Sequence, residues 1–209
     1  MLRASIRSAL IGALLIGLSS GTIAATSQAK KAPASSQAPT SQAKKAPANA
    51  SALVIKDFLK RVDDYATLHK KLEGSLPKLA KQATPQELDA HERTLATLVQ
   101  ESRKDAKPGD LLTRAMQGFV RTVLRPLFSG KEGLQIKDEI LDKEYKGNVK
   151  LVVNGRYPDE VPVSTMPPQV LAALPKLPEE LEYRFIQNNM ILFDSHAHLI
   201  ADFMARAFN

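Results

Sequence analysis

The residues of this chain whose types could perform chemistry are concentrated between positions 194 and 202. Asp194, His196 and His198 alternate along the chain, and Asp202 follows four residues later. On a β-strand the first three side chains would share one face, whereas on a helix Asp194, His198 and Asp202 would share one. Either arrangement offers imidazole nitrogens and carboxylate oxygens, which are ligands for zinc, copper or nickel. The spacing therefore predicts a divalent-metal site at Asp194, His196, His198 and Asp202. The alternative is a polar turn that precedes an apolar tail over 199–204.

A second histidine pair lies on two predicted helices, which we expect to pack as an antiparallel hairpin. The pairing of their apolar seams would place His69 opposite His91. This contact predicts either a pH-sensitive interface or a two-histidine metal site, for which Glu73 or Glu87 would supply a carboxylate. Alternatively, both histidines are polar residues at the rim of the interface, with solvated tails.

Composition excludes several other chemistries. The 209 residues include no cysteine, which rules out a disulfide framework, a thiolate nucleophile and an iron–sulfur cluster. The chain has no Gly-rich phosphate loop and no Gly-x-Ser-x-Gly nucleophile motif. Because no convergent acid, base and nucleophile can be assembled, we expect a non-catalytic protein first.

The net charge of +7 is concentrated at the N-terminal end of the chain. Residues 1–51 hold six of the 29 basic residues and none of the 22 acidic ones, so 52–209 carries a formal charge of only +1. A nucleic-acid-binding domain concentrates positive charge on the fold itself. The distribution therefore argues against a nucleic-acid partner.

The first 25 residues have the organisation of a secretory signal peptide. Arg3 and Arg7 precede an apolar run over 9–18, and small residues follow it up to a predicted cleavage after Ala24 or Ala25. The apolar run is about half as long as the roughly 20 residues that a membrane span requires. We therefore expect an exported protein, periplasmic or secreted, with no stable membrane span after cleavage; retention of the segment as an anchor is the alternative.

Residues 26–51 form a low-complexity linker rich in Ala, Lys, Pro and Ser. The octapeptide at 27–34 recurs identically at 41–48. A segment without large apolar side chains cannot offset the entropy of ordering, so we expect a disordered tether. Its lysines could make weak contacts with anionic envelope polymers. The alternative is a solvated spacer that arose by duplication.

Three amphipathic helices are predicted in the first part of the folded chain, 52–130. Ser51 is the expected N-cap of the first helix, and Thr84 with Glu87 forms a capping box that starts the second. Each helix carries one apolar stripe, so an antiparallel helical bundle is the expected packing. The stripes are Ile55, Phe58, Val62, Tyr65, His69 and Leu72; Leu88, His91, Leu95 and Leu98; and Leu112, Met116, Phe119 and Val123.

The second part, 131–209, predicts shorter elements interrupted by prolines. A short helix is expected over 133–144, and a strand-like run over 149–153 precedes an Asn154–Gly155 turn signal. This mixture predicts a small mixed region that packs against the helices.

The strongest strand signals predict a C-terminal β-hairpin. Apolar runs at 181–187 and 190–194 flank Asn188 and Asn189, which tolerate the positive φ of a two-residue turn. In that register Phe185 pairs with Leu192, and Tyr183 pairs with Asp194. The predicted fold class is α+β, with 52–209 as a single domain.

The stretch over 174–203, LPKLPEELEYRFIQNNMILFDSHAHLIADF, resembles the closing segment of a group of uncharacterised exported bacterial proteins. The break at 72–77 inside the helical half is similar too. The resemblance implies a signal peptide, a helical N-terminal half and an apolar strand that ends in Asp; it implies no activity and no site residues. Members of the group tend to have asparagine where this chain has His198.

The expected function is a non-catalytic periplasmic or envelope module that binds an unknown envelope or periplasmic partner or gives structural support. It needs no cofactor. The alternative is a metal-binding protein or metal-dependent hydrolase that uses the cluster between 194 and 202 and one divalent ion.

Overall fold

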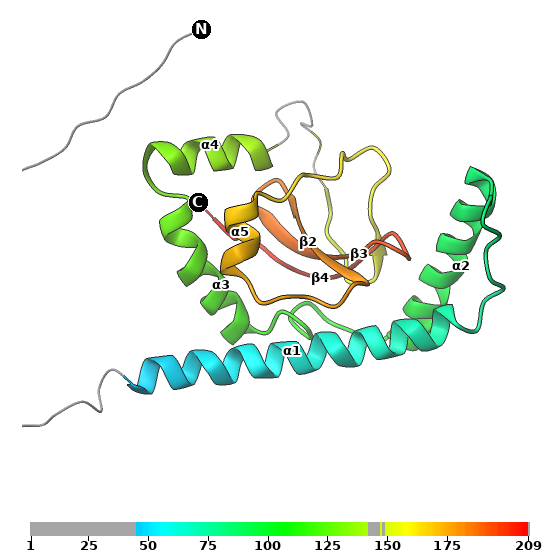
Figure 1. Ribbon diagram of the computed structural model, residues 1–209, viewed down its shortest axis with the longest axis horizontal. Helices are drawn as coiled ribbons and strands as arrows, with labels where there is room; N and C mark the ends of the chain where they lie inside the picture. The colour runs from blue at the N-terminus through cyan, green and yellow to red at the C-terminus, as the bar shows by residue number, and fades with distance from the viewer. Residues whose placement is uncertain (1–44, 142–146, 148, 209) are drawn as a thin grey trace, which may run out of the picture. The chain divides into compact units, whose positions relative to one another are not determined.

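The computed structural model describes residues 45–141, 147 and 149–208 of the chain. These residues form five helices and a four-stranded antiparallel sheet (Figure 1). The fold is therefore α+β, as the sequence predicts. Within the described residues, no helix combines the length and the apolar character needed to cross a lipid bilayer.

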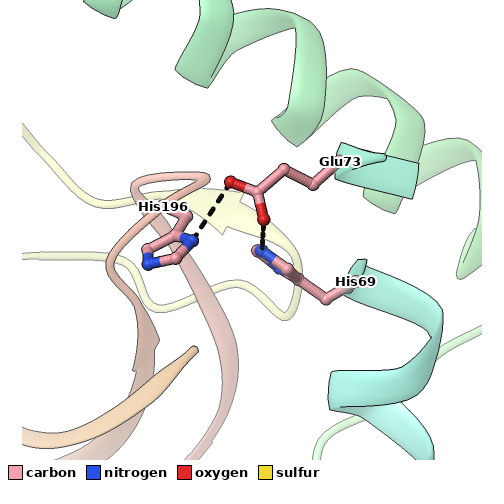
Figure 2. Close-up of side chains that lie close together, drawn as sticks. All are labelled: His69, Glu73 and His196. Atoms are coloured by element: carbon pink, nitrogen blue, oxygen red, sulfur yellow. Dashed lines mark hydrogen bonds and ion pairs between the residues drawn. The ribbon is translucent and has the colours of Figure 1, made fainter. Parts of the chain in front are cut away.

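Helix α1 (Lys45–Glu73) is the longest element and runs along one side of the molecule (Figure 1). It begins at Lys45, so Ser51 lies inside the helix, and the prediction that Ser51 is its N-cap is wrong. Alanines at alternate positions through 50 favour the helix, and a proline at 47 is tolerated in a first turn. The rest of the predicted tether lies outside the described residues. The last turns of α1 carry His69 and Glu73 (Figure 2).

Helix α2 (Pro85–Ser102) begins at the predicted capping box. The Thr84 hydroxyl accepts from the backbone N–H of Glu87 at 3.3 Å, and the Glu87 carboxylate accepts from the backbone N–H of Thr84 at 2.7 Å. Both otherwise unpaired N–H groups are thereby satisfied. α2 packs against α1 through buried Leu95 and Val99.

Helix α3 (Arg114–Leu127) has Thr113 as its N-cap and contacts both α4 (Gly130–Ile140) and α5 (Pro168–Ala173). α4 begins and ends earlier than the predicted 133–144.

The sheet has the strand order β1–β4–β3–β2, and every neighbouring pair is antiparallel. The strands are β1 (Gly155–Arg156), β2 (Leu181–Ile186), β3 (Asn189–Asp194) and β4 (Leu199–Met204). β4 lies inside the sheet, so the apolar tail expected over 199–204 is a strand, and the expected polar turn precedes it at 195–198. The run at 149–153 is not a strand, because the chain reaches the edge of β4 only at Asn154 and Gly155.

Strands β2 and β3 are joined by a turn at Gln187 and Asn188, and Gln187 has a φ of 55°. Phe185 pairs with Met190 and Tyr183 pairs with Leu192, so the predicted register is wrong. The turn lies one residue earlier than expected, and this moves every cross-strand pair by two positions.

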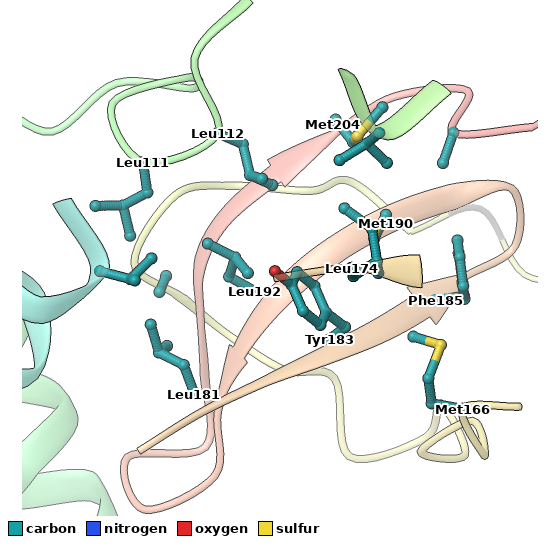
Figure 3. Close-up of a cluster of buried hydrophobic side chains, with 14 of the residues drawn as sticks. Leu111, Leu112, Met166, Leu174, Leu181, Tyr183, Phe185, Met190, Leu192 and Met204 are labelled. Atoms are coloured by element: carbon teal, nitrogen blue, oxygen red, sulfur yellow. The ribbon is translucent and has the colours of Figure 1, made fainter. Parts of the chain in front are cut away.

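The two faces of the sheet are covered by different parts of the chain. One face, with Tyr183 and Leu192, packs against the helices in a large apolar core (Figure 3). The other face, with Ile191 and Phe193, packs against Tyr157. Because both faces are buried, β3 is apolar along nearly its whole length instead of alternating.

Candidate metal centre

His69 is buried in the apolar stripe of α1. It follows Phe58, Val62 and Tyr65 at helical spacing, and it is only 1% exposed. A buried imidazole needs a hydrogen-bond partner. His69 has one in Asp194, whose carboxylate lies 2.6 Å from the ring nitrogen Nδ1. This hydrogen bond allows the polar His69 ring to be buried in line with the apolar side chains of α1.

Asp194 is the last residue of β3 and is fully buried. Its Oδ2 atom accepts from the Tyr65 hydroxyl at 2.5 Å and contacts His69 Nδ1 at 2.6 Å. Its Oδ1 atom accepts from the backbone N–H groups of His196 at 3.1 Å and Ala197 at 2.9 Å. The carboxylate therefore fixes both the ring of His69 and the turn that carries His196.

These contacts set the pKa values of the two buried side chains on α1. Burial by itself would lower the pKa of His69, but the hydrogen bond and charge of Asp194, with the charges of Glu73 and Glu180, outweigh it, so this pKa is raised. Burial, reinforced by Asp194, raises the pKa of Tyr65 well above its usual value. The Tyr65 hydroxyl consequently stays protonated and donates a hydrogen bond to Asp194.

Glu73 lies one turn after His69 and brings its carboxylate between two imidazole rings (Figure 2). Its Oε2 atom is 3.5 Å from His69 Nε2, and its Oε1 atom is 3.2 Å from His196 Nδ1. The ring centroids of His69 and His196 are 5.4 Å apart. One ligand atom from each of the three residues lies within 4.8 Å of the other two.

The Nε2 atom of His69 is the unusual feature of this cluster. It is buried and has no hydrogen-bond partner among the described residues, although Nδ1 of the same ring is bonded. The cluster opens to solvent on the opposite side, where the side chains of Glu73 and His196 are 35% and 44% exposed. An ion could therefore enter from solvent and reach the inward-facing nitrogen.

Of the four residues predicted as ligands between 194 and 202, only His196 belongs to this cluster. Asp194 is in contact with it but uses its oxygens for hydrogen bonds to Tyr65, His69 and the following turn. The structure does not bring the remaining two to the same place.

His198 lies on the other side of the β3–β4 turn and has a φ of 49°. Its ring contacts those of Tyr157 and Phe193 at centroid distances of 5.7 and 5.4 Å. The nearest carboxylate is that of Asp159, 3.8 Å from Nε2. His198 therefore packs with the small core on the second face of the sheet.

Asp202 is fully buried in β4, where it organises the loop before α3. Its carboxylate accepts from the backbone N–H groups of Gly109, Leu111 and Leu112, and Oδ2 lies 2.8 Å from each of the last two. These bonds account for its burial without a metal.

The predicted pairing of His69 with His91 is replaced by other contacts. His69 turns toward Asp194 and Glu73, whereas His91 lines a surface hollow together with Glu73 and Leu76. Sequence reasoning thus named His69, Glu73 and His196, but it assigned them to two separate sites. The spacing of His69 and Glu73, four residues apart on one helix face, is the local signal for the pair.

Comparison of the chain with protein-family models, with curated proteins and with solved structures gave no match.

Proposed function

We propose that this chain is an exported protein that binds one divalent transition-metal ion through His69, Glu73 and His196. The observation that carries the proposal is the buried Nε2 atom of His69, which forms no hydrogen bond with a described residue and lies 3.5 Å from the Glu73 carboxylate. A buried nitrogen without a partner is costly, and a metal ion would satisfy it.

The contacts around His69 support this proposal. Metal-binding histidines usually donate their second ring N–H to a carboxylate, which fixes the tautomer and orients the ring. Asp194 stands in that position at Nδ1 of His69. In the neutral ring with its proton at Nδ1, the lone pair of Nε2 points toward the shared space, so a metal ion competes with a proton for this nitrogen.

The spacing of the three side chains supports it as well. Two ligands that each lie about 2.1 Å from a tetrahedral zinc ion are about 3.4 Å apart. The contacts of Glu73 with His69 and His196 measure 3.5 and 3.2 Å. The same carboxylate could bind the ion with either oxygen after small adjustments.

The donor set favours particular metals. Two imidazoles and one carboxylate suit Zn²⁺, Cu²⁺ and Ni²⁺ better than Mg²⁺ or Ca²⁺, which prefer oxygen ligands. Among these, affinity at a flexible site should be highest for Cu²⁺. We therefore expect Zn²⁺ and Cu²⁺ binding and little response to Mg²⁺.

We also propose how the parts of the chain serve this centre. The helical part, 52–130, acts as an antiparallel bundle that supplies His69 and Glu73. The mixed part, 131–209, with its C-terminal hairpin, supplies His196. The signal peptide directs export, and the basic linker holds the domain near anionic envelope polymers.

Cleavage of the signal peptide can be tested by N-terminal sequencing, because the exported protein should begin at Ala25 or Thr26.

The principal role that we propose is metal binding without catalysis, as a periplasmic or envelope module. A metal-dependent hydrolase is the second candidate, because three protein ligands leave a coordination position open for water. Zinc-loaded protein and zinc-free protein can be compared on an activated ester such as 4-nitrophenyl acetate. A zinc-dependent rate that is lost in Glu73→Gln would favour the hydrolase.

The test of metal binding is calorimetric titration of Zn²⁺ and Cu²⁺ into chelator-treated protein. We expect one site with a dissociation constant below about 1 μM, as is usual for a pre-organised site with two imidazoles. Glu73→Gln and His196→Asn should each weaken binding by at least about tenfold, since each removes a ligand. His91→Asn is the matched control and should leave the affinity unchanged. Binding that is absent, or that persists at full strength in both ligand variants, would refute the proposal.

A further inference from the structure

A second site is suggested by a small hollow between the end of α3 and the C-terminal segment. It has a volume of about 170 Å³ and is lined by Arg121, Arg125 and Arg206, with Phe128, Ser129 and Phe208. Figure 1 shows the C-terminal end of the chain beside the junction of α3 and α4. None of the described residues that line the hollow is acidic.

The three arginines are brought together by elements far apart in sequence. Arg121 and Arg125 lie one turn apart on the same face of α3. Arg206 has a φ of 50°, and its backbone N–H donates to the Asn189 side chain at 3.2 Å. The next residue, Ala207, donates its N–H to the Asn188 carbonyl at 2.8 Å. These bonds fix the backbone of Arg206 against the turn between β2 and β3.

Arg121 has a structural task at this place. Its guanidinium donates to the carbonyl oxygens of Ala205 at 2.9 Å and Arg206 at 3.2 Å. The other two guanidinium groups form no hydrogen bond or ion pair with a described residue. Arg125 and Arg206 are thus available to a ligand while Arg121 keeps the C-terminal segment in place.

Two buried aromatic rings line the hollow. The rings of Phe128 and Phe208 are 4.5 Å apart between centroids, and Phe208 also contacts Phe185 at 5.3 Å. Because these rings are buried in the main core, the wall of the hollow keeps its shape.

Three guanidinium groups line one small hollow, and an anion bound among them would be attracted by all three. Planar guanidinium groups bind phosphate oxygens in a bidentate manner, which adds geometric fit to the charge. The hollow, of about 170 Å³, has room for one tetrahedral oxyanion with some hydration. We propose that this hollow binds a phosphate group, with Arg125 and Arg206 as its principal ligands. The group could belong to an anionic lipid headgroup or to free phosphate.

The test is calorimetric titration of inorganic phosphate into the purified protein in the presence of a metal chelator, so that its result is independent of the metal centre. Arg125→Gln/Arg206→Gln should weaken phosphate binding by at least about tenfold, because two charge-assisted contacts are lost. Lys78→Gln/Lys176→Gln, which removes the same charge from exposed positions elsewhere, should bind like the unaltered protein. Circular dichroism confirms that both variants are folded.

Vesicle sedimentation decides the source of the phosphate. Vesicles of phosphatidylglycerol and phosphatidylcholine should retain the unaltered protein and the lysine variant but not the arginine variant, if a lipid headgroup is the ligand. If phosphate binds but vesicles retain all three proteins equally, or none, the ligand is free phosphate. The proposal is overturned if phosphate does not bind at millimolar concentration, or if both double variants weaken binding equally.

Discussion

The carboxylate of Asp194 lies 2.6 Å from Nδ1 of His69, and this contact joins β3 to α1 across 125 residues of the chain. Both side chains are buried, so the contact forms only once the helix has packed against the sheet. It directs the opposite ring nitrogen, Nε2, toward Glu73. The geometry of the candidate metal centre therefore depends on a residue that is not itself a ligand.

Asp194→Asn tests this dependence. The amide would keep the size of the side chain but lose the charge that holds the proton on Nδ1 of His69. We expect metal affinity to fall by about 10–100-fold, as is usual when a carboxylate behind a metal-binding histidine is removed. Calorimetric titration of Zn²⁺ measures the change. Asp159→Asn, at an exposed carboxylate beside His198, is the control, and equal affinities in the two variants would contradict this role.

The Tyr65 hydroxyl should contribute more to stability than the hydroxyl of another buried tyrosine. Tyr65 donates to the Asp194 carboxylate, whereas Tyr183 donates to the neutral carbonyl of Pro175. Hydrogen bonds to charged groups contribute about 1.5–3 kcal/mol and neutral ones about 0.5–1.5 kcal/mol. Urea unfolding should therefore show a larger loss of free energy of unfolding for Tyr65→Phe than for Tyr183→Phe. The reverse order would show that the hydrogen bond from Tyr65 to Asp194 stabilises the fold less than the one from Tyr183 to Pro175.

The capping box of α2 should make stability sensitive to acid. The backbone N–H and then the hydroxyl of Thr84 donate to the Glu87 carboxylate and lower the pKa of this group from its usual 4.5. A lowered folded-state pKa contributes stability that is complete above the unfolded-state pKa and is lost as the pH falls through the folded-state value.

Glu87→Gln isolates this contribution, because a protonated glutamate resembles glutamine. Urea midpoints followed by circular dichroism should differ between the variant and the unaltered protein at pH 7, and the difference should close as the pH falls below about 4.5. Glu160→Gln, at an exposed loop position, should show no such closing gap. A difference that is the same at pH 3 and pH 7 would rule out the charged form of Glu87 as its source.

Local patterns in the sequence predicted the helices better than the sheet. The stripe through Phe58 and Val62 is buried, and the Thr84–Glu87 capping box starts α2, because both features depend on residues within a few positions of one another. β4 was missed because Asp202 interrupts its apolar run. That carboxylate is buried only because the loop at 109–112 supplies its donors, about 90 residues away.

The candidate site was predicted in fragments for the same reason. His69 and Glu73 are local neighbours on one helix face, but His196 joins them from the β3–β4 turn. The alternation of Asp194, His196 and His198 suggested one shared face. The strand ends at Asp194, and the turn after it sends His196 toward α1 and His198 toward Tyr157. Only the tertiary arrangement separates these two histidines.

His198→Asn provides a direct test of that separation. His198 has a φ of 49°, a conformation that asparagine tolerates and that β-branched residues avoid at a cost of about 1–2 kcal/mol. His198→Asn should therefore fold and bind Zn²⁺ with unchanged affinity, and His198→Val should be about 1–2 kcal/mol less stable than His198→Asn in urea unfolding. Loss of zinc binding in a folded His198→Asn variant would place His198 among the ligands. Equal stability of the two variants would show that the turn can relax away from its left-handed conformation.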